Sequence, residues 1–435
     1  MSLAILALIL FASIFLLVLY GYPVAFTLGG LSLIYAFCFL DLTVLTLLPN
    51  RVMGVMENGV LLAVPLFIFM GIMLEKSGLA ERMLRTMAEL FGRVRGGMAV
   101  SVIIVGALLA ASTGIVGATV ITMGLISLPP MLKRGYPPTV STGVIAASGT
   151  LGQIIPPSVV LVLLGSVLGV SVGKLFKAAL VPSLLLVGAY VLYVLVLGLL
   201  RPKLFPAGSE DNQPWNVDFL KRLVQSLFLP LLLIVAVLGS ILAGWASPTE
   251  AAAIGAAGAA LLTLSQGQLS WRTVKDVCQS TTHLTSMVFM ILLGATTFSL
   301  VFRELGGDSF LVSLIEQNDL AEYQFLALVM VVVFVAGFFI DFIEIVFIIV
   351  PVVTPIFVGF GTDLIWLGIL LGINLQTSFL SPPFGFALFY LKGVAPPEVK
   401  TIHLYKGIIP FLLIQLVLLV VILFFPEWLG VGGQG

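Results

Sequence analysis

Polar residues and paired prolines interrupt two apolar segments of this chain. The first interruption reads GTLGQIIPP over residues 149–157, and the second reads NLQTSFLSPP over residues 374–383. Paired prolines remove backbone donors and clash with the preceding helical turn, so each helix has to open at this point. Inside a membrane, an opened helix is tolerated only where protein or a water-filled cavity surrounds it. Two such breaks at corresponding places point to the binding site of a secondary transporter.

The chemistry of an opened helix follows from its backbone. Carbonyl and hydroxyl oxygens suit a hard cation such as Na⁺, and helix N-termini suit a carboxylate. Each break therefore predicts one Na⁺ site, with an anionic substrate between the two, although the same small residues would also let helices pack closely. The candidates for the first sodium site are Ser112, Thr113, Gly114, Gly149, Gly152, Ile154 and Pro156. Those for the second are Gly337, Asp341, Gln376, Thr377, Ser378 and Pro382, and those for the substrate are Gln153, Ser158, Asn374 and Gln376.

Two carboxylates stand close to the second break. A charge in the middle of a membrane costs roughly 2.5–3.5 kcal/mol on insertion scales, so it is a functional-site hypothesis by default. We expect Asp341 to bind the cation, and Glu344 to pair with a backbone amide or with Arg303. The first half has Ile115 and Ala118 at the matching positions, so the two sites differ chemically.

The elements that position these residues must be transmembrane helices. The chain has 435 residues, of which 60% are hydrophobic and 9% charged, whereas soluble domains carry about 25% charged residues. Apolar runs of about 20 residues, enough to cross a bilayer, recur throughout. The first run is expected to be a retained span, since the basic region and cleavage site of a signal peptide are missing. No constellation for hydrolysis, metal catalysis or ATP binding stands out, and the sequence predicts neither a cofactor besides the coupling Na⁺ nor a nucleic-acid partner.

Basic residues predict the orientation in the membrane, because they mark the cytoplasmic side. Most of them fall into six clusters: Lys76/Arg82/Arg85/Arg93/Arg95, Lys133/Arg134, Arg201/Lys203, Lys221/Arg222, Arg272/Lys275 and Lys392/Lys400/Lys406. The apolar stretch 98–131 has such clusters at both ends, which predicts a hairpin that enters from the cytoplasm and returns. The stretch 323–360 is flanked by acidic residues, which predicts a hairpin entering from the opposite side.

The same order of elements repeats in two halves. Because their hairpins are predicted to enter from opposite sides of the membrane, the two halves are predicted to be inverted relative to each other. Pro129 matches Pro355, Gly135 matches Gly361 and Pro156 matches Pro382, all at one offset. The first half, 1–200, is predicted to hold scaffold helices (1–75), a hairpin (98–131), a broken helix (138–168) and a closing helix (174–200). The second, 223–425, holds scaffold helices (223–267), a helix (281–303), a hairpin (323–360), a broken helix (362–392) and a closing helix (404–425). A cytoplasmic linker (201–222) joins them, and amphipathic arms are expected at Leu79–Val94 and Leu269–Ser280.

Five motifs resemble the large membrane subunit of TRAP (tripartite ATP-independent periplasmic) transporters. They are AASTGIVGAT (110–119), SGTLGQIIPPS (148–158), WASPTEAAA (245–253), GFFIDFIE (337–344) and NLQTSFLSPPFGFALFYLKG (374–393). The residues of these motifs are most similar to those of the branch named for mannitol and chloroaromatic compounds. Residues 112–115 depart from the Ser-Gly-Ser-Ser of sialic acid members, which favours cation ligation by the backbone in the first half.

The resemblance implies a multi-pass subunit of the bacterial inner membrane that imports a small organic anion, driven by Na⁺. It further implies a periplasmic substrate-binding protein, a small four-helix membrane subunit and an elevator motion of the hairpins and broken helices against a scaffold. A self-sufficient carrier with the same architecture is the alternative. An intramembrane enzyme or sensor is a third interpretation, but Asp341 and Glu344 are its only support.

Overall fold

The computed structural model describes residues 3–92, 94–206 and 217–429. Every regular element within these ranges is a helix. Arg93 and the central part of the predicted linker, 207–216, lie outside these ranges. The first half contains α1 (Leu3–Leu19), α2 (Val24–Phe39), α3 (Leu48–Met56), α4 (Ala63–Lys76), α5 (Leu79–Leu90), α6 (Gly97–Thr113), α7 (Val116–Lys133), α8 (Pro138–Thr150), α9 (Val159–Leu168) and α10 (Val172–Leu200). The second contains α11 (Val217–Leu223), α12 (Leu229–Leu242), α13 (Pro248–Ser265), α14 (Trp271–Glu304), α15 (Gly307–Gln317), α16 (Glu322–Ala336), α17 (Phe342–Ile348), α18 (Val350–Phe360), α19 (Leu364–Leu380), α20 (Phe386–Val394) and α21 (Thr401–Phe424).

The long helices have the dimensions of membrane spans. Six of them in the described chain are long and apolar enough to cross a bilayer, and the bent pair α17–α18 would make a seventh. These six include α10, α14 and α21, with 29, 34 and 24 residues. A helix needs about 20 residues to cross the hydrocarbon core. The protein is therefore a multi-pass, all-helical membrane protein.

Two helical hairpins face the breaks. In the first, α6 ends at Gly114, whose φ of 62° is left-handed, and α7 returns after one residue. Glycine takes this conformation without the steric penalty that a side chain would bring. In the second, α16 ends at Gly337, a short turn leads to α17, and the chain bends by 53° before α18.

Each break interrupts the helix that follows a hairpin. After α8 a short 3₁₀ turn, η3 (Leu151–Gln153), leads to the Pro156–Pro157 pair, and Ser158 precedes α9. After α19 the pair Pro382–Pro383 leads to α20. The Pro–Pro bond is cis in both breaks.

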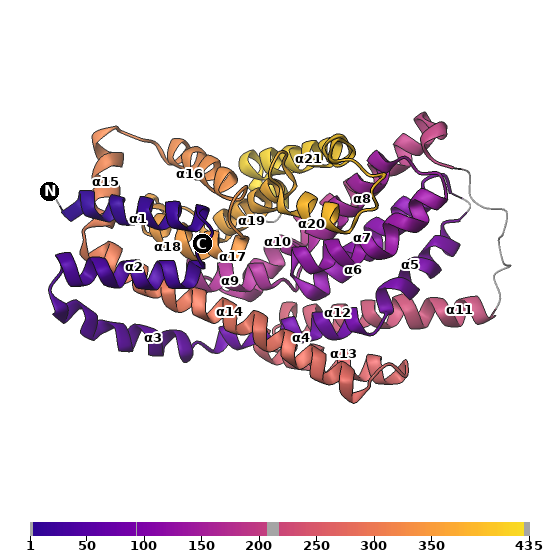
Figure 1. Ribbon diagram of the computed structural model, residues 1–435, viewed down its shortest axis with the longest axis horizontal. Helices are drawn as coiled ribbons and strands as arrows, with labels where there is room; N and C mark the ends of the chain where they lie inside the picture. Colours follow the sequence, from indigo (N-terminus) through magenta and orange to yellow (C-terminus); the bar gives the residue numbers. More distant parts are fainter. Residues whose placement is uncertain (1–2, 93, 207–216, 430–435) are drawn as a thin grey trace.

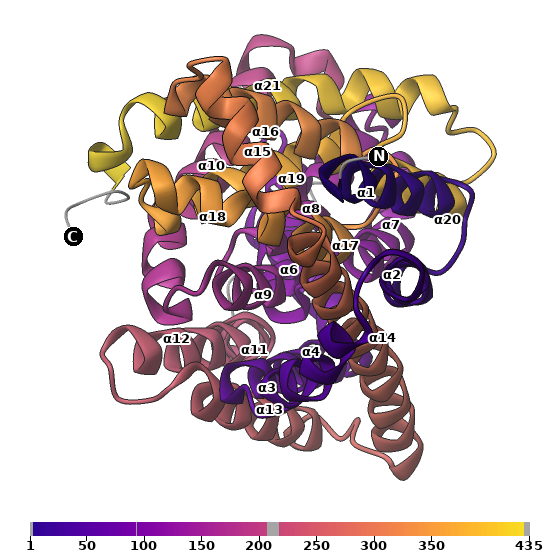
Figure 2. The same cartoon turned by 90° about the vertical axis from the view of Figure 1, so that its left-hand side faces the viewer.

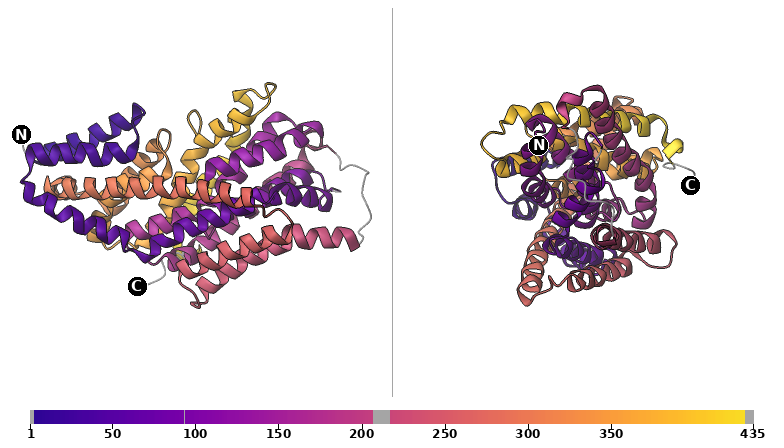
Figure 3. Two further views of the ribbon diagram at one scale, coloured as in Figure 1. Left: turned by 60° about the horizontal axis from the view of Figure 1, so that its bottom comes forward. Right: turned by 90° about the vertical axis from the view of Figure 1, so that its right-hand side faces the viewer.

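The broken helices occupy the middle of the molecule. Seen end-on, α8, α9, α17 and α19 lie between α10, α16 and α21 on one side and α3, α4, α11, α12 and α13 on the other (Figure 2). The long helix α14 crosses from the side of α2 to that of α13 (Figure 1). From below, α11, α12 and α13 form the lower edge, away from the α1–α2 pair (Figure 3).

Close backbone contact joins the two halves where α8 crosses α21. A methyl group on Gly143 would collide with the carbonyl of Gly407, and one on Gly407 would collide with the carbonyl of Thr139. Small residues let membrane helices approach this closely. The helix that leads into the first break is thus fixed against the closing helix of the second half.

Three features differ from the sequence-based expectation. The predicted helix 281–303 and the predicted arm Leu269–Ser280 form one continuous helix, α14, which starts at the Ser270 cap. Hydropathy rises along this helix, and no glycine or proline occurs between Trp271 and Leu293 to break it where the composition changes. Two short helices, α3 and α15, were not predicted; α15 follows Gly306 just as the arm α5 follows Gly78, both glycines being left-handed.

Candidate functional site

The first hairpin packs directly on the first break. A methyl group on Gly152 would collide with the carbonyl of Ala110 in α6, and one on Gly149 would collide with Val120 in α7. At the tip, Gly114 lies against Val159, the first residue after the break. The contact between these two pieces of chain therefore depends on glycine backbone on both sides.

The hydroxyl groups at this tip bond to each other and to the backbone of the hairpin, and they leave two backbone carbonyls of the break unpaired. Ser112 donates to the carbonyl of Leu109 (2.7 Å), and the hydroxyls of Thr113 and Thr119 are 2.7 Å apart. No described residue donates a hydrogen bond to the carbonyls of Ile154 and Pro156. Unpaired backbone carbonyls are the kind of oxygen ligand that a hard cation binds.

The second break is packed against its own hairpin. Gly337, which ends α16, leaves no space for a methyl group beside Ser378 of α19. Ser378 donates to the carbonyl of Phe334 (2.6 Å), and Asn374, one turn earlier, donates to that of Met330 (2.8 Å). Two polar side chains of α19 thereby fasten the second break to α16.

Asp341 caps the second arm of this hairpin. Its carboxylate accepts a hydrogen bond from the amide of Phe342 (2.8 Å), and Glu344 accepts one from the amide of Asp341 (3.1 Å). This is a capping box, which holds both carboxylates at the helix N-terminus. Of the two partners predicted for Glu344, the amide is the one observed, because Arg303 pairs with Asp308 (3.1 Å).

The two glutamines of the breaks are buried without partners. Gln153 and Gln376 both have an exposed fraction of 0%, and neither the amide nitrogen nor the oxygen of either side chain has a hydrogen bond with any residue that the structure describes. Such a group costs about 1–3 kcal/mol when nothing satisfies it. Ser158 donates to the carbonyl of Gln153 (2.9 Å), and Thr377 to that of Ile373 (2.7 Å). Both breaks therefore hold an unsatisfied donor and acceptor that a polar ligand would satisfy.

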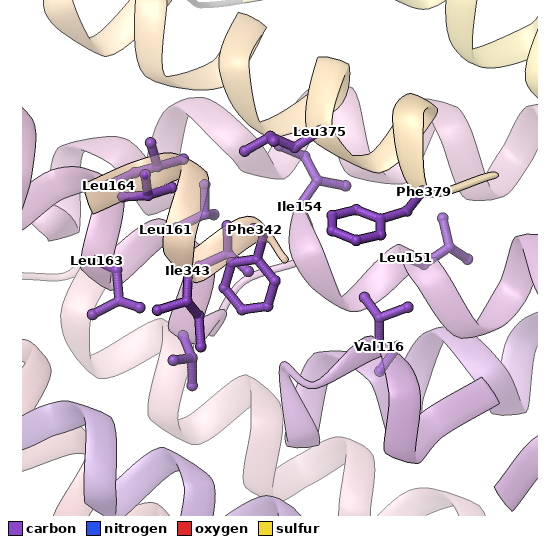
Figure 4. Close-up of a cluster of buried hydrophobic side chains, with 14 of the residues drawn as sticks. Val116, Leu151, Ile154, Leu161, Leu163, Leu164, Phe342, Ile343, Leu375 and Phe379 are labelled. Atoms are coloured by element: carbon purple, nitrogen blue, oxygen red, sulfur yellow. The ribbon is translucent and has the colours of Figure 1, made fainter. Parts of the chain in front are cut away.

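An apolar cluster joins the two breaks into one body. Ile154 of the first break lies beside Leu375 and Phe379 of α19, and Phe342 of the second hairpin lies close by (Figure 4). Gly372 of α19 likewise faces Ile154 at van der Waals distance. The side chains of this cluster are buried, with Ile154, Leu375 and Phe379 at most 1% exposed, so displacement of one break would carry the other with it.

Two further contacts at the first hairpin were missed by sequence reasoning. Thr122 of α7 donates to the carboxylate of Glu75 in α4 (2.6 Å), and the ring of Tyr390 in α20 lies against Gly117 of α7. Glu75 could have been recognised as a candidate partner from the sequence, because it is a charged residue at the end of an apolar helix. For Thr122 and Tyr390 no local signal existed, because their partners are distant in sequence.

The fastening role of Asn374 gives a stability prediction. Asn374→Leu should lower the free energy of unfolding by about 0.5–1.5 kcal/mol, since it removes the hydrogen bond that the Asn374 amide donates to the carbonyl of Met330. The measurement is thermal unfolding of the purified protein without substrate. Asn318→Leu is the matched control, because Asn318 donates a similar bond to Leu314 on the exposed end of α15. Equal losses in the two variants would contradict a special role for the α19–α16 bond.

Comparison with known proteins agrees with this architecture. The family model described as the DctM component of tripartite ATP-independent periplasmic transporters matches residues 11–428. The C4-dicarboxylate TRAP transporter large permease protein DctM of Pseudomonas aeruginosa is 33% identical over 384 residues, which cover 86% of this chain and 88% of that protein. Its counterpart from Rhodobacter capsulatus is 31% identical and covers 97% of both chains.

A solved structure shares the fold at much lower sequence identity. The YdaH transporter of Alcanivorax borkumensis superimposes with a TM-score of 0.60 and 17% identity, covering 98% of each chain. Both named relatives are transporter permeases and not enzymes. The chain therefore belongs to the DctM family, the large membrane subunits of TRAP transporters.

Proposed function

We propose that this subunit imports a small organic anion, a carboxylate, together with Na⁺ across the bacterial inner membrane. The observation that carries the proposal is the pair of buried, unpartnered glutamines, one in each break. The substrate carboxylate would accept hydrogen bonds from the amide groups of Gln153 and Gln376, with Ser158 and Asn374 near it. The two related permeases are named for C4-dicarboxylates, which supports a carboxylate substrate.

The cations would occupy the two contacts between hairpin and break. In the first, the ligands would be the tip residues Ser112–Gly114 and the carbonyls between Gly149 and Pro156. In the second, they would be Gly337, Asp341, the hydroxyls of Thr377 and Ser378, and the carbonyl of Pro382. No described residue donates a hydrogen bond to the carbonyls of Gly337 and Pro382, which supports this assignment.

The motion would be that of an elevator built from two inverted repeats. The hairpins and broken helices share one buried apolar core, which supports their movement as a rigid transport domain. Helices α1–α4 and α11–α14 would form the scaffold, with the polar arm α5 between the two parts. The arm is held by Glu89, paired with Arg222 (3.2 Å), and by Thr86, bonded to Ser226 (3.1 Å).

Family membership supports a tripartite assembly. A periplasmic substrate-binding protein would deliver the anion, and a small four-helix subunit would brace the scaffold. The finer assignment to the branch named for mannitol and chloroaromatic compounds stays a prediction.

Reconstitution tests this function. Proteoliposomes holding this chain and its small subunit should accumulate substrate only with an inward Na⁺ gradient and with the binding protein present. Uptake by this chain alone would favour the self-sufficient carrier, and uptake driven equally by a K⁺ gradient would contradict Na⁺ coupling.

The glutamines allow function to be separated from folding. Gln153→Leu and Gln376→Leu should each weaken substrate binding by about tenfold, the value of one buried hydrogen bond. Neither should lower the melting temperature, because leucine replaces an unsatisfied buried amide by an apolar group. Isothermal titration and thermal unfolding measure the two effects, with the exposed Gln279→Leu as control. Loss of stability with unchanged binding would assign both glutamines a structural role.

A further inference from the structure

A separate groove lies where the ends of several helices meet, away from both breaks. It has a volume of about 330 Å³ and is formed by α8, α10, α21 and the short turn η4 (Pro202–Leu204). Its inner wall includes the buried, apolar Val144, Val194, Phe205 and Phe411. The volume is within the range of pockets that bind small organic ligands.

Two cations line the rim of this groove. Arg201 follows the last residue of α10, and Lys406 lies in the second turn of α21; both side chains are exposed. Neither takes part in an ion pair or a side-chain hydrogen bond with any residue that the structure describes. The groove therefore combines an apolar interior with two free positive charges at its edge.

The position of the groove along the helices is that of a membrane surface. α10 is apolar up to Leu200 and α21 becomes apolar after Lys406. The rings of Tyr193 and Phe411, which both line the groove, pack edge to face with centroids 5.2 Å apart. Basic and aromatic residues at the ends of apolar spans are typical of the boundary between headgroups and hydrocarbon.

We infer that this groove binds an anionic phospholipid. The phosphate would lie between Arg201 and Lys406, and an acyl chain would cover the wall formed by Val144, Val194 and Phe411. The charge of the rim argues against a neutral lipid, and the apolar wall argues against a soluble anion. Basic pockets between transmembrane helices bind acidic headgroups by this combination of charge and apolar contact.

The lipid would act on the crossing of the two halves. Gly407 and Thr139 line the groove, and they form the close backbone contact between α21 and α8. A bound lipid fills the space beside this crossing and links α8, α10 and α21. Because it binds the folded protein only, it raises thermal stability, and the gain grows with the logarithm of its concentration above Kd.

Native mass spectrometry of the full chain in detergent tests the inference. The probes are phosphatidylglycerol, phosphatidylcholine of the same acyl chains, and inorganic phosphate. We expect retention of one phosphatidylglycerol, a matching rise in melting temperature, and neither effect with the other two probes. Arg201→Gln/Lys406→Gln should bind phosphatidylglycerol about 25-fold more weakly, because each basic residue close to an anionic headgroup contributes about fivefold to the affinity.

The control is Arg272→Gln/Lys221→Gln, which removes the same two charge types from exposed positions outside the groove. It should bind phosphatidylglycerol as the unmodified chain does. Equal loss in both double variants would show diffuse attraction and overturn the site. Equal binding of phosphatidylcholine, or full competition by inorganic phosphate, would also overturn it. None of these outcomes depends on Na⁺ or substrate, so the result is independent of the proposed transport function.

Discussion

Asp341→Asn is expected to raise the Na⁺ concentration for half-maximal uptake by at least about tenfold, because a hydrogen bond or contact to a charged group contributes about 1.5–3 kcal/mol. The protein should remain folded. Asparagine caps a helix about as well as aspartate, so the bond to the Phe342 amide survives and only the negative charge is lost. The measurement is initial uptake rate against Na⁺ concentration in proteoliposomes, with substrate saturating.

The chain offers a matched control for this substitution. Asp363 also caps a helix, α19, and accepts hydrogen bonds from Ile365 (2.7 Å) and Trp366 (3.3 Å) at an exposed position outside the site. Asp363→Asn should leave the Na⁺ dependence unchanged. An identical Na⁺ curve for Asp341→Asn and the unmodified protein would remove Asp341 from the cation site.

Gly152→Ala is expected to reduce uptake by at least about tenfold and to lower stability by about 1–3 kcal/mol, the usual cost of overpacking. The added methyl group would collide with the backbone carbonyl of Ala110, which has no rotamer by which to yield. The hairpin tip must therefore separate from the break, and the oxygens contributed by the two elements no longer converge. Uptake assays and thermal unfolding measure the two effects.

Gly188→Ala tests whether any added methyl group would do the same. Gly188 lies in α10 with no atom near its missing side chain. Alanine is favoured over glycine in a helix by about 1 kcal/mol, so this variant should be as stable as the unmodified chain or more stable. If Gly152→Ala transports normally, the close contact between α6 and η3 is not required for function.

The signals that predict the breaks and hairpins are local in the sequence. Proline pairs, the glycine at the first hairpin tip and the change from polar to apolar composition each act on a few neighbouring residues. The membership in the TRAP family and the multi-pass helical architecture are confirmed. The assignment of individual sodium and substrate ligands stays a prediction.

Sequence reasoning missed contacts between residues that are distant in the sequence. It also took a change in hydropathy within α14 for the start of a new helix. Thr122 and Glu75 are 47 positions apart, and nothing in either segment indicates their hydrogen bond. The Gly143–Gly407 crossing likewise joins separate halves. By contrast, the continuity of α14 was readable, since no glycine or proline occurs between Trp271 and Leu293. The drop in polarity at Met287 marks the entry into the membrane and not the start of a helix.

The most direct test of the central claim is a high-resolution cryo-EM map of the assembled transporter with saturating Na⁺, compared with one in choline. Na⁺ binding at both hairpin–break contacts should give ion density there, one beside the carbonyls of Ile154 and Pro156 and one beside Asp341 and the carbonyl of Pro382. Both densities should be absent in choline. Na⁺-dependent uptake with both contacts empty, or with the ions bound elsewhere, would contradict Na⁺ binding at these contacts.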